Sequence, residues 1–282
     1  MKILTFDIEE WFHILDTDAT RTEDTWSAYE SRIQANTDRI LGALSGRRRR
    51  ATFFCLGWIA KKYPDIIRKI DKEGYEIASH SSLHQLVYDQ GPKAFRNDVS
   101  DSLHAIEDVI GRKITMYRAP GFSVGSETPW AFDILAECGI EIDCSVFPAR
   151  HGHGGFREFG HAQPAIISVN GKTLREFPIN LFSLAGKSLI FSGGGYFRLL
   201  PYPVIAGLFR RADYCMTYFH PRDFDAQQPV IKGLSLRRKF KSYIGLKSAF
   251  AKLTKLLDDF EFTDVGTAAG TIEWEKAPVV HL

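Results

Sequence analysis

The sequence predicts a single-domain α/β protein built as a (β/α) barrel that is incomplete or distorted. Short apolar runs rich in β-branched and aromatic residues alternate with longer segments of helical period, which is typical of parallel strands joined by crossover helices. The length of 282 residues fits one barrel of this kind. The chain contains no internal repeat and no low-complexity linker that would divide it into further domains.

The first half of the chain shows the alternation most clearly. Pro92 favours the first turn of a helix, and glycines at 46, 74, 111 and 139 follow the last periodic residues of the expected helices. The expected strands are 3–8, 51–56, 75–79, 114–118 and 140–146, and the expected helices are 26–44, 58–72, 92–111 and 129–137.

The pattern loosens between residues 147 and 195, where Gly, Pro and His are frequent. We expect this segment to contain only short strands, and residues 151–195 within it to determine the substrate. The remaining expected elements are strands at 165–169, 174–179, 214–219 and 262–265 and helices at 203–211 and 248–260. The barrel core is therefore expected over 3–225, with a C-terminal helix and strand from 226–282 packed on it.

Composition excludes several classes of protein. With 36 Lys plus Arg against 34 Asp plus Glu, the net charge of +2 argues against a protein whose main task is to coat nucleic acid or an anionic membrane. The four cysteines form no C-x-x-C pair, which is typical of buried cytosolic thiols. The first apolar run breaks at Asp7, too early for a signal peptide, and no run is long enough to span a membrane. We therefore expect a cytoplasmic protein.

Ionisable residues follow five of the expected strands. The carboxyl ends of barrel strands meet at one rim, so these side chains should converge on one site. The residues are Asp7 with Glu9 and Glu10, His80 with His84, Arg118, Asp143 and His220. Taken singly, each has a structural or solvated interpretation, but together they indicate a hydrolytic site.

Residue type and spacing suggest roles for some of them. Asp7 and Glu9 share one face of a strand, so one carboxylate can bind a metal while the other acts as a base. His80 and His84 can present two imidazoles to the same ion. Two histidines and one carboxylate leave positions for water and substrate, as a catalytic zinc or a similar divalent ion requires.

The loop 118–122 and His220 supply the remaining chemistry. Arg118 can hold a carboxylate by a two-pronged contact, and the Gly121 N–H can point at a developing oxyanion. His220 is suited to act as a general acid toward a leaving amine, although a single histidine of this kind is more often structural.

Four of these segments resemble, in family order, the motifs of the polysaccharide deacetylases (carbohydrate esterase family four). They are Thr5-Phe6-Asp7-Ile8-Glu9, His80-Ser81-Ser82-Leu83-His84, Arg118-Ala119-Pro120-Gly121 and Phe219-His220. The variants at 6–12, 118–123, 143–148, 194–202 and 218–221 resemble the exopolysaccharide-locus branch, which includes exosortase-associated deacetylases. The resemblance implies a distorted (β/α)₇ barrel and metal-dependent removal of an N-acetyl group from an amino sugar in a bacterial polysaccharide or its precursor.

The resemblance also implies roles for individual residues. Asp7 would be the base, His80 and His84 metal ligands, Arg118 the partner of Asp7, His220 the acid and Asp143 a second partner of Arg118. Ile8 replaces the usual metal-binding Asp, so the carboxylate ligand is Glu9 or Glu10, and facing parity favours Glu9. Zn²⁺ is the expected ion, with Co²⁺, Ni²⁺ or Mn²⁺ as alternatives.

Other residues are candidates for substrate contact. Gly121 stands where the family often has an aromatic residue and Phe122 follows it, while Tyr196 and Arg198 can contact sugar hydroxyls or phosphate. The histidines at 151, 153 and 161 indicate a flexible loop rather than a second metal site. The basic stretch 237–241 is either a solvated face or a contact with an anionic lipid carrier or membrane surface.

Two other functions stay open at this point. One is hydrolysis of a different C–N bond, for example in a nucleotide-linked or lipid-linked sugar. The other is a catalytically silent sugar-binding member of a biosynthetic complex.

Overall fold

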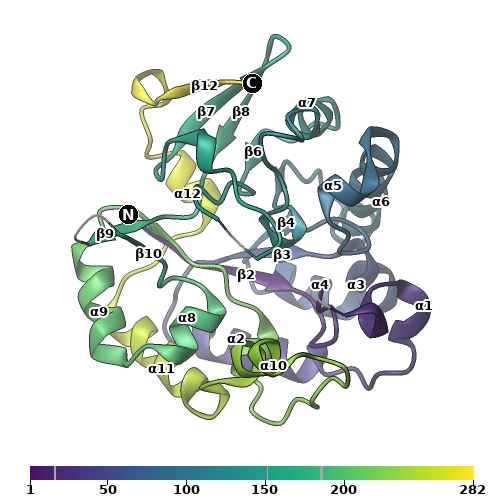
Figure 1. Ribbon diagram of the computed structural model, residues 1–282, viewed down its shortest axis with the longest axis vertical. Coiled ribbons are helices and arrows are strands. Elements are labelled where there is room, and N and C mark those ends of the chain that lie inside the picture. The colour runs from purple at the N-terminus through teal and green to yellow at the C-terminus, as the bar shows by residue number, and fades with distance from the viewer. Residues whose placement is uncertain (16, 151, 185–186) are drawn as a thin grey trace.

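The computed structural model describes residues 1–282 except 16, 151 and 185–186. Its centre is a mostly parallel sheet with the strand order β12-β7-β8-β6-β5-β4-β3-β2, flanked by helices (Figure 1). Only the β7–β8 hairpin within this sheet is antiparallel. Beyond β2 the arrangement continues through a parallel bridge between Phe6 and Phe219, and β1 pairs with β11. The predicted α/β class is confirmed.

The bounds of the elements follow the predicted alternation over most of the chain. The strands are β1 (Lys2–Ile3), β2 (Thr5–Ile8), β3 (Thr52–Cys55), β4 (Glu76–Ser79), β5 (Met116–Tyr117), β6 (Ile142–Asp143), β7 (Ala165–Val169), β8 (Lys172–Glu176), β9 (Phe182–Leu184), β10 (Lys187–Leu189), β11 (Cys215–Met216) and β12 (Val279–His281). The α-helices are α1 (Glu23–Trp26), α2 (Ile33–Ser45), α3 (Gly57–Lys62), α4 (Pro64–Lys72), α5 (Val87–Gln90), α6 (Pro92–Ile110), α7 (Trp130–Glu137), α8 (Gly194–Leu199), α9 (Tyr202–Arg211), α10 (Leu236–Tyr243), α11 (Leu246–Asp259) and α12 (Val265–Ala269). Short 3₁₀ helices include η2 (Pro120–Phe122) and η4 (Pro221–Phe224).

Several expected elements differ from the structure. The helix expected at 26–44 begins only at Ile33, and Trp26 ends the separate short helix α1. The helix expected at 58–72 is divided at Tyr63, because Pro64 has no N–H to continue the first helix but fits the first turn of the next. The strand expected at 262–265 is reduced to a bridge between Ile3 and Thr263, since α12 already begins at Val265.

Both ends of the chain join the central β-structure. β1 pairs with β11, and β12, close to the C-terminus, pairs with β7. The segment 226–282 contains α10, α11 and α12 as well as β12, which is more than the one helix and one strand expected. These pairings support the single-domain prediction.

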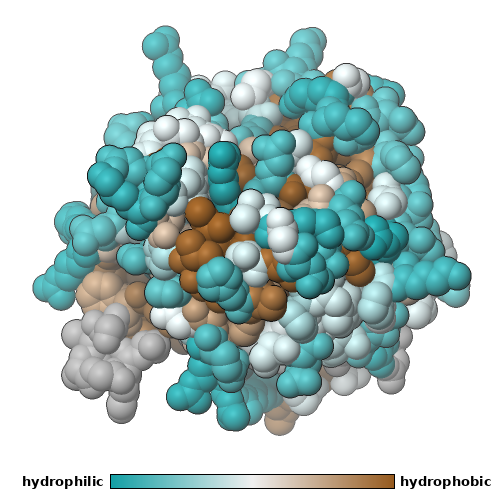
Figure 2. All heavy atoms as spheres, turned by 90° about the horizontal axis from the view of Figure 1, so that it is seen from above, coloured by the Kyte–Doolittle hydropathy of each residue, from teal (hydrophilic) through white to brown (hydrophobic). Residues whose placement is uncertain are grey.

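The strands that carry the candidate site are buried. Every residue of β2 and of β3 is buried, including the polar Thr5, Asp7 and Thr52. Figure 2 looks onto the end that carries the β7–β8 hairpin, where hydrophilic side chains surround a hydrophobic area near the centre. Within the described part of the chain, no helix has both the length and the apolar character needed to cross a bilayer.

Candidate active site

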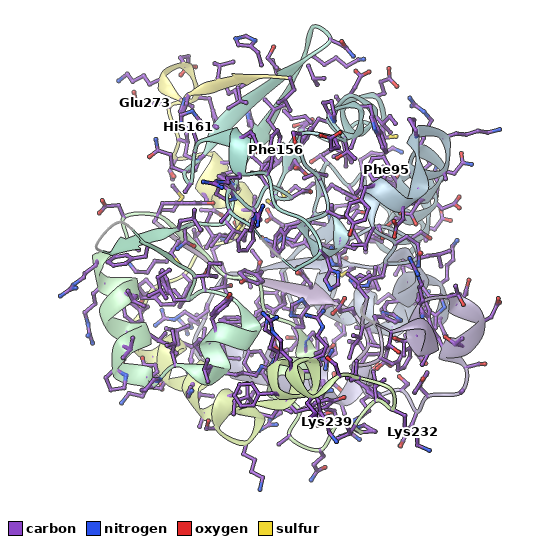
Figure 3. The ribbon with its side chains drawn as sticks, viewed as in Figure 1. Phe95, Phe156, His161, Lys232, Lys239 and Glu273 are labelled. Carbon is purple, nitrogen blue, oxygen red and sulfur yellow. The ribbon has the colours of Figure 1, made fainter. Side chains whose placement is uncertain are left out.

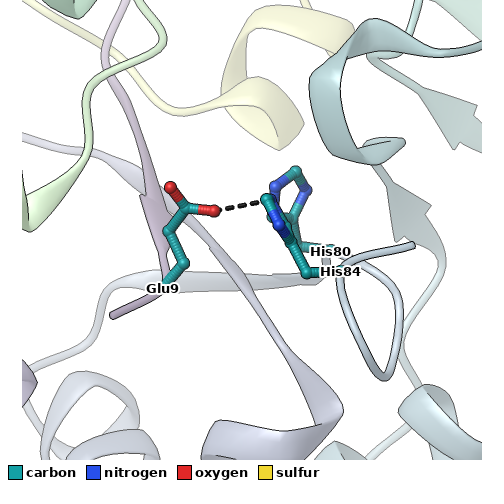
Figure 4. Close-up of side chains that lie close together, drawn as sticks. All are labelled: Glu9, His80 and His84. Carbon is teal, nitrogen blue, oxygen red and sulfur yellow. Dashed lines mark ion pairs between the residues drawn. The ribbon is translucent and has the colours of Figure 1, made fainter. Parts of the chain in front are cut away.

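Glu9, His80 and His84 form a compact cluster beyond the carboxyl ends of β2 and β4. One ligand atom from each residue lies within 4.8 Å of the others, and all three residues are buried (Figure 4). Glu9 Oε2 is 2.5 Å from His84 Nε2. This set of one carboxylate and two imidazoles is suited to a divalent transition-metal ion.

The protonation of the cluster also fits a cation. His80 Nδ1 lies 2.8 Å from the carbonyl oxygen of Arg118, a contact that fixes the ring and leaves Nε2 for a ligand. Burial lowers the pKa of His80 to about 4, so its imidazole is neutral. Burial opposes ionisation of Glu9, but His84 and His220 outweigh it and hold the pKa of this carboxyl well below its usual range.

Asp98 of α6 binds the backbone of the loop that carries His80 and His84. Its buried carboxylate accepts hydrogen bonds from the Ser82 N–H at 3.0 Å and the Leu83 N–H at 3.1 Å. Ser81 and His84 have φ of +70° and +54°, a conformation that residues other than glycine adopt at some cost and often at functional sites. Sequence reasoning missed Asp98, because an acidic residue within a helix carries no local signal of a distant loop.

Glu10, the alternative to Glu9, is used elsewhere. Its side chain accepts hydrogen bonds from the Ser31 hydroxyl and from the N–H groups of Arg32 at 3.2 Å and Ile33 at 3.3 Å. It therefore satisfies backbone donors at the start of α2. The geometry places Glu9, and not Glu10, beside the two histidines.

Asp7 and Arg118 form a buried ion pair next to this cluster. Arg118 Nη1 donates to Asp7 Oδ1 at 2.6 Å and to Thr5 Oγ1 at 2.8 Å, and its guanidinium lies 4.0 Å from the centre of the Phe54 ring. Both charged residues are almost completely buried. Removing one partner of such a pair leaves the other charge buried without a partner, which typically lowers the free energy of unfolding by about 3 to 5 kcal/mol.

His220 faces both carboxylates from the neighbouring backbone segment. The Asp7 N–H donates to the Phe219 carbonyl at 2.8 Å, which brings the next residue, His220, to the site. His220 Nε2 is 3.7 Å from Asp7 Oδ2 and 3.8 Å from Glu9 Oε1. Burial disfavours the imidazolium, but Glu9, Asp223 and Asp7 outweigh it and raise the pKa of His220 to about 9.

Asp223 orients this imidazole and was missed by sequence reasoning. Its Oδ2 accepts from the His220 N–H at 2.9 Å and lies 3.0 Å from His220 Nδ1, while Oδ1 lies 3.1 Å from Arg198 Nε. The detectable signal is an acidic residue three positions after His220, at the start of η4.

Arg198 differs from its predicted role as a sugar contact. It is buried, and its guanidinium is occupied by Asp223 and by four carbonyl oxygens. The carbonyls belong to Gly194, Lys241, Ser242 and Ile244. Arg198 therefore fastens the end of α10 to the residue that orients His220.

The glycines before Arg198 have a packing role in the site. A Cβ on Gly193 would overlap the Tyr218 ring, and a Cβ on Gly194 would overlap the Asp223 carboxylate, whereas a Cβ on Gly195 would meet open space. The run of glycines thus lets the α8 backbone approach Asp223 closely.

Asp143 also differs from its predicted place. Its carboxylate accepts from the Ser145 hydroxyl at 2.6 Å and the Ser145 N–H at 3.1 Å, and it interacts with the buried Glu176. The hydrogen bonds of the described residues do not join Asp143 to Arg118, whose carboxylate partner is Asp7. Burial, and after it the neighbouring Asp143 carboxylate, raise the pKa of Glu176 well above its usual value.

The other substrate candidates fall into two groups. Phe122 is buried and packs against Phe147 and Tyr218, with ring centres 5.4 and 5.1 Å away, so it forms part of the wall around Arg118. Tyr196 is exposed and stays a substrate-contact prediction. Gly121 has φ of +61°, and a Cβ there would crowd His153, so the glycine is required by its loop; its oxyanion role stays a prediction.

The two described histidines of the glycine-rich segment, His153 and His161, do not gather around a second ion. His151 lies outside the described residues, His153 Nε2 lies 2.6 Å from Arg238 Nη2, and His161 packs against Phe159. Apart from Glu9, His80 and His84, the described residues contain no cluster of potential metal ligands.

Comparisons with known proteins identify the family of the first half of the chain and the fold. Residues 15–142 match the polysaccharide deacetylase family, and residues 144–269 match a domain family of unknown function, DUF3473. A candidate polysaccharide deacetylase structure from Mycobacterium smegmatis has the same fold, with a TM-score of 0.64 and 21% identity over 100% of this chain and 92% of that one. The barrel expected from the sequence is therefore the fold of this chain.

Two curated relatives are similar over a shorter region. A peptidoglycan-N-acetylmuramic acid deacetylase of Bacillus subtilis is 32% identical over 93 residues, which is 33% of this chain and 20% of that protein. A chitooligosaccharide deacetylase of Azorhizobium caulinodans is 32% identical over 100 residues, 35% of this chain and 46% of that protein. The matches thus span less than half of either relative. Together with the family match, they show that residues 15–142 of the chain belong to the polysaccharide deacetylase family.

Proposed function

We propose that the chain is a divalent-metal-dependent deacetylase that removes the N-acetyl group from an amino sugar of a bacterial polysaccharide or its precursor. The observation that carries this proposal is the cluster of Glu9, His80 and His84 beside the Asp7–Arg118 pair and His220. Amide hydrolysis needs an activated water and a proton for the leaving nitrogen, and this site offers a group for each. The named activities of the curated relatives support the same reaction class.

Glu9, His80 and His84 are the residues that would hold the metal. A bound divalent ion supplies Lewis acidity toward the acyl oxygen and lowers the pKa of water at this position. Zn²⁺ suits two imidazoles and a carboxylate best, and Co²⁺, Ni²⁺ or Mn²⁺ are the alternatives.

Asp7 acts as the general base. Arg118 holds Oδ1 through a 2.6 Å hydrogen bond, so the carboxylate keeps one orientation and presents Oδ2 toward His220. Oδ2 is the atom that accepts the proton of the attacking water. The ion pair also keeps the carboxylate from rotating away when the site is empty of substrate.

His220 acts as the general acid. Its pKa of about 9 keeps the imidazole protonated at neutral pH. Asp223 fixes Nδ1, which leaves the Nε2 proton directed into the site for the departing sugar amine. When it gives up that proton, the His220 imidazolium becomes neutral imidazole. Asp7 releases to solvent the proton that it took from water, and His220 regains a proton from solvent.

Acetate release tests the proposal. The purified protein, loaded with Zn²⁺, is assayed with N-acetylated chitooligosaccharides, a nucleotide-linked N-acetylhexosamine and a lipid-linked one. We expect release that a chelator abolishes and that His84→Ala eliminates. His104→Ala is the matched control, because His104 is exposed on α6. A metal-loaded wild-type protein that releases no acyl group from any of the three substrates would refute the proposal.

The biological setting is a further part of the proposal. The segments 143–148 and 194–202 resemble the exopolysaccharide-locus branch, which supports a substrate from exopolysaccharide synthesis. The four cysteines are free, and three of them, Cys55, Cys144 and Cys215, are buried, which supports a reducing, cytoplasmic location. Comparing product release from the nucleotide-linked sugar and from the oligosaccharides distinguishes a precursor from a polymer substrate.

A further inference from the structure

Helix α10 presents an apolar stripe to the outside of the molecule. Leu236 and Phe240, one helical turn apart, are 87% and 57% exposed, and none of the eight residues of α10 is buried. At about 100° per residue, Arg237 and Lys239 lie on opposite sides of this stripe. Arg238 projects from the opposite face of the helix toward the protein. The exposed face is therefore an apolar centre with basic flanks.

The surrounding segment carries charge of one sign only. Residues 226–257 contain no Asp or Glu, although the whole chain has nearly balanced charge. The basic residues of this segment are Lys232, Arg237, Arg238, Lys239, Lys241, Lys247, Lys252 and Lys255. Lys232 and Lys239 lie along the same edge of the molecule (Figure 3). The segment that includes α10 thus carries a net charge of +8 in a chain whose net charge is +2.

The helix is anchored to the protein at both ends of its inner face. Arg238 contacts His153 at 2.6 Å, and the Arg198 guanidinium bonds the carbonyl oxygens of Lys241, Ser242 and Ile244. Arg198 in turn contacts Asp223, which orients His220. Because these bonds use the backbone and the inner face, Leu236 and Phe240 stay available at the surface close to the site.

We propose that the exposed face of α10 binds the surface of a membrane that contains anionic lipid. A short helix with an apolar stripe between basic residues lies in the headgroup plane, where the apolar side chains enter the acyl boundary and the cations meet lipid phosphates. A soluble polyanion would match the basic residues but leave Leu236 and Phe240 in water. The two exposed apolar side chains therefore favour a bilayer.

The proposed membrane binding does not depend on the proposed deacetylation. Arg198 joins α10 to Asp223, so docking through α10 holds the His220 rim of the site near the bilayer. Substrates at the membrane would then meet the site more often than those in bulk solution.

Vesicle co-sedimentation of the full-length protein tests the proposal. We expect binding to vesicles of equal parts phosphatidylcholine and phosphatidylglycerol at about 50 mM salt, and loss of most of it at about 500 mM, because salt screens exposed charges. Vesicles of phosphatidylcholine alone should bind at least about tenfold less protein.

Two variants divide the surface into its components. Arg237→Gln, Lys239→Gln and Lys241→Gln together should lower the partition coefficient about 100-fold, since each basic residue contributes a factor of about five. Leu236→Ser with Phe240→Ser should lower it at least about tenfold. The matched control is Lys61→Gln, Lys72→Gln and Lys93→Gln, which removes exposed charges from α3, α4 and α6 and should bind as the wild type does. Circular dichroism melts check that all variants are folded.

Three results would overturn the proposal. The first is absence of binding to anionic vesicles at low salt. The second is equal loss of binding in the control variant, which would indicate only nonspecific attraction. The third is wild-type binding by the Leu236→Ser, Phe240→Ser variant together with full competition by heparin, which would indicate a soluble polyanion as the partner.

Discussion

The site residues from the first 120 positions of the chain lie at or just beyond the ends of buried strands. His220 instead lies at the start of a short 3₁₀ helix, and 26% of its side chain is exposed. Asp7, Arg118 and the cluster of Glu9, His80 and His84 lie at the ends of sheet strands, and a buried ion pair joins Asp7 to Arg118. His220 is fixed by one side chain, Asp223, which depends in turn on Arg198. We therefore expect substitutions in the buried region, which is Asp7, Arg118 and the Glu9–His80–His84 cluster, to abolish activity. Substitutions in the acid region, around His220 and Asp223, should reduce activity by degrees.

The largest effect should come from the buried region. Asp7→Asn removes the proton acceptor but keeps the shape of the side chain and a hydrogen-bonding oxygen for Arg118. We expect turnover to fall by about 10²- to 10⁴-fold, the usual contribution of a general base. Acetate release measures turnover, and metal content measured on the same sample should be unchanged. Full activity with metal bound would show that another group is the base.

Asp223→Asn should have a smaller, pH-dependent effect. A residue that orients a catalytic histidine typically contributes about 10- to 100-fold to activity. The Asp223 carboxylate also helps to raise the pKa of His220 to about 9. His220 must be protonated to act as an acid, so activity is retained below this pKa and lost as the pH rises through it.

A pH profile of turnover checks this expectation. The variant should lose activity at a lower pH than the wild type, because the pKa of His220 falls when the neighbouring negative charge is removed. His220→Ala should lose this alkaline limb altogether and lower turnover by at least about 10²-fold. An alkaline limb that does not move in Asp223→Asn would contradict the assignment of Asp223 to His220.

The smallest effect tests how the acid region is packed. Gly194→Ala should displace the Asp223 carboxylate, lower the free energy of unfolding by about 1 to 3 kcal/mol and reduce turnover less than Asp223→Asn does. Gly195→Ala is the control, because a Cβ there meets open space and alanine favours the helix by about 0.5 to 1 kcal/mol. Thermal melts and acetate release on both variants measure the difference. Equal behaviour of the two variants would mean that Asp223 does not need the close approach of α8.

The same contrast explains what sequence reasoning could predict. Glu9, His80 and Arg118 follow strands with clear apolar patterns, and strand ends converge by the geometry of the fold, so their proximity was predictable. The substrate role predicted for Arg198 was wrong because three of its carbonyl partners lie more than 40 residues later in the chain and leave no trace in the pattern. Asp98 was missed because the loop that it holds lies in another element of the fold, and an acidic residue within a helix gives no sign of that contact.

Glu9 and Glu10 illustrate the limit of pattern arguments within one strand. Alternation favoured Glu9 as the metal ligand, and the structure gives Glu10 the separate task of satisfying the first N–H groups of α2. That task depends on where α2 begins, which the sequence does not reveal to within a residue.

The most direct test of the account is the metal content of two matched variants. Glu9→Gln and Glu10→Gln are purified, supplied with Zn²⁺, dialysed and analysed by mass spectrometry for metal per chain. We predict that Glu9→Gln loses stoichiometric metal, whereas Glu10→Gln retains it and only melts at a lower temperature. Stoichiometric metal in Glu9→Gln together with its loss in Glu10→Gln would contradict the site described above.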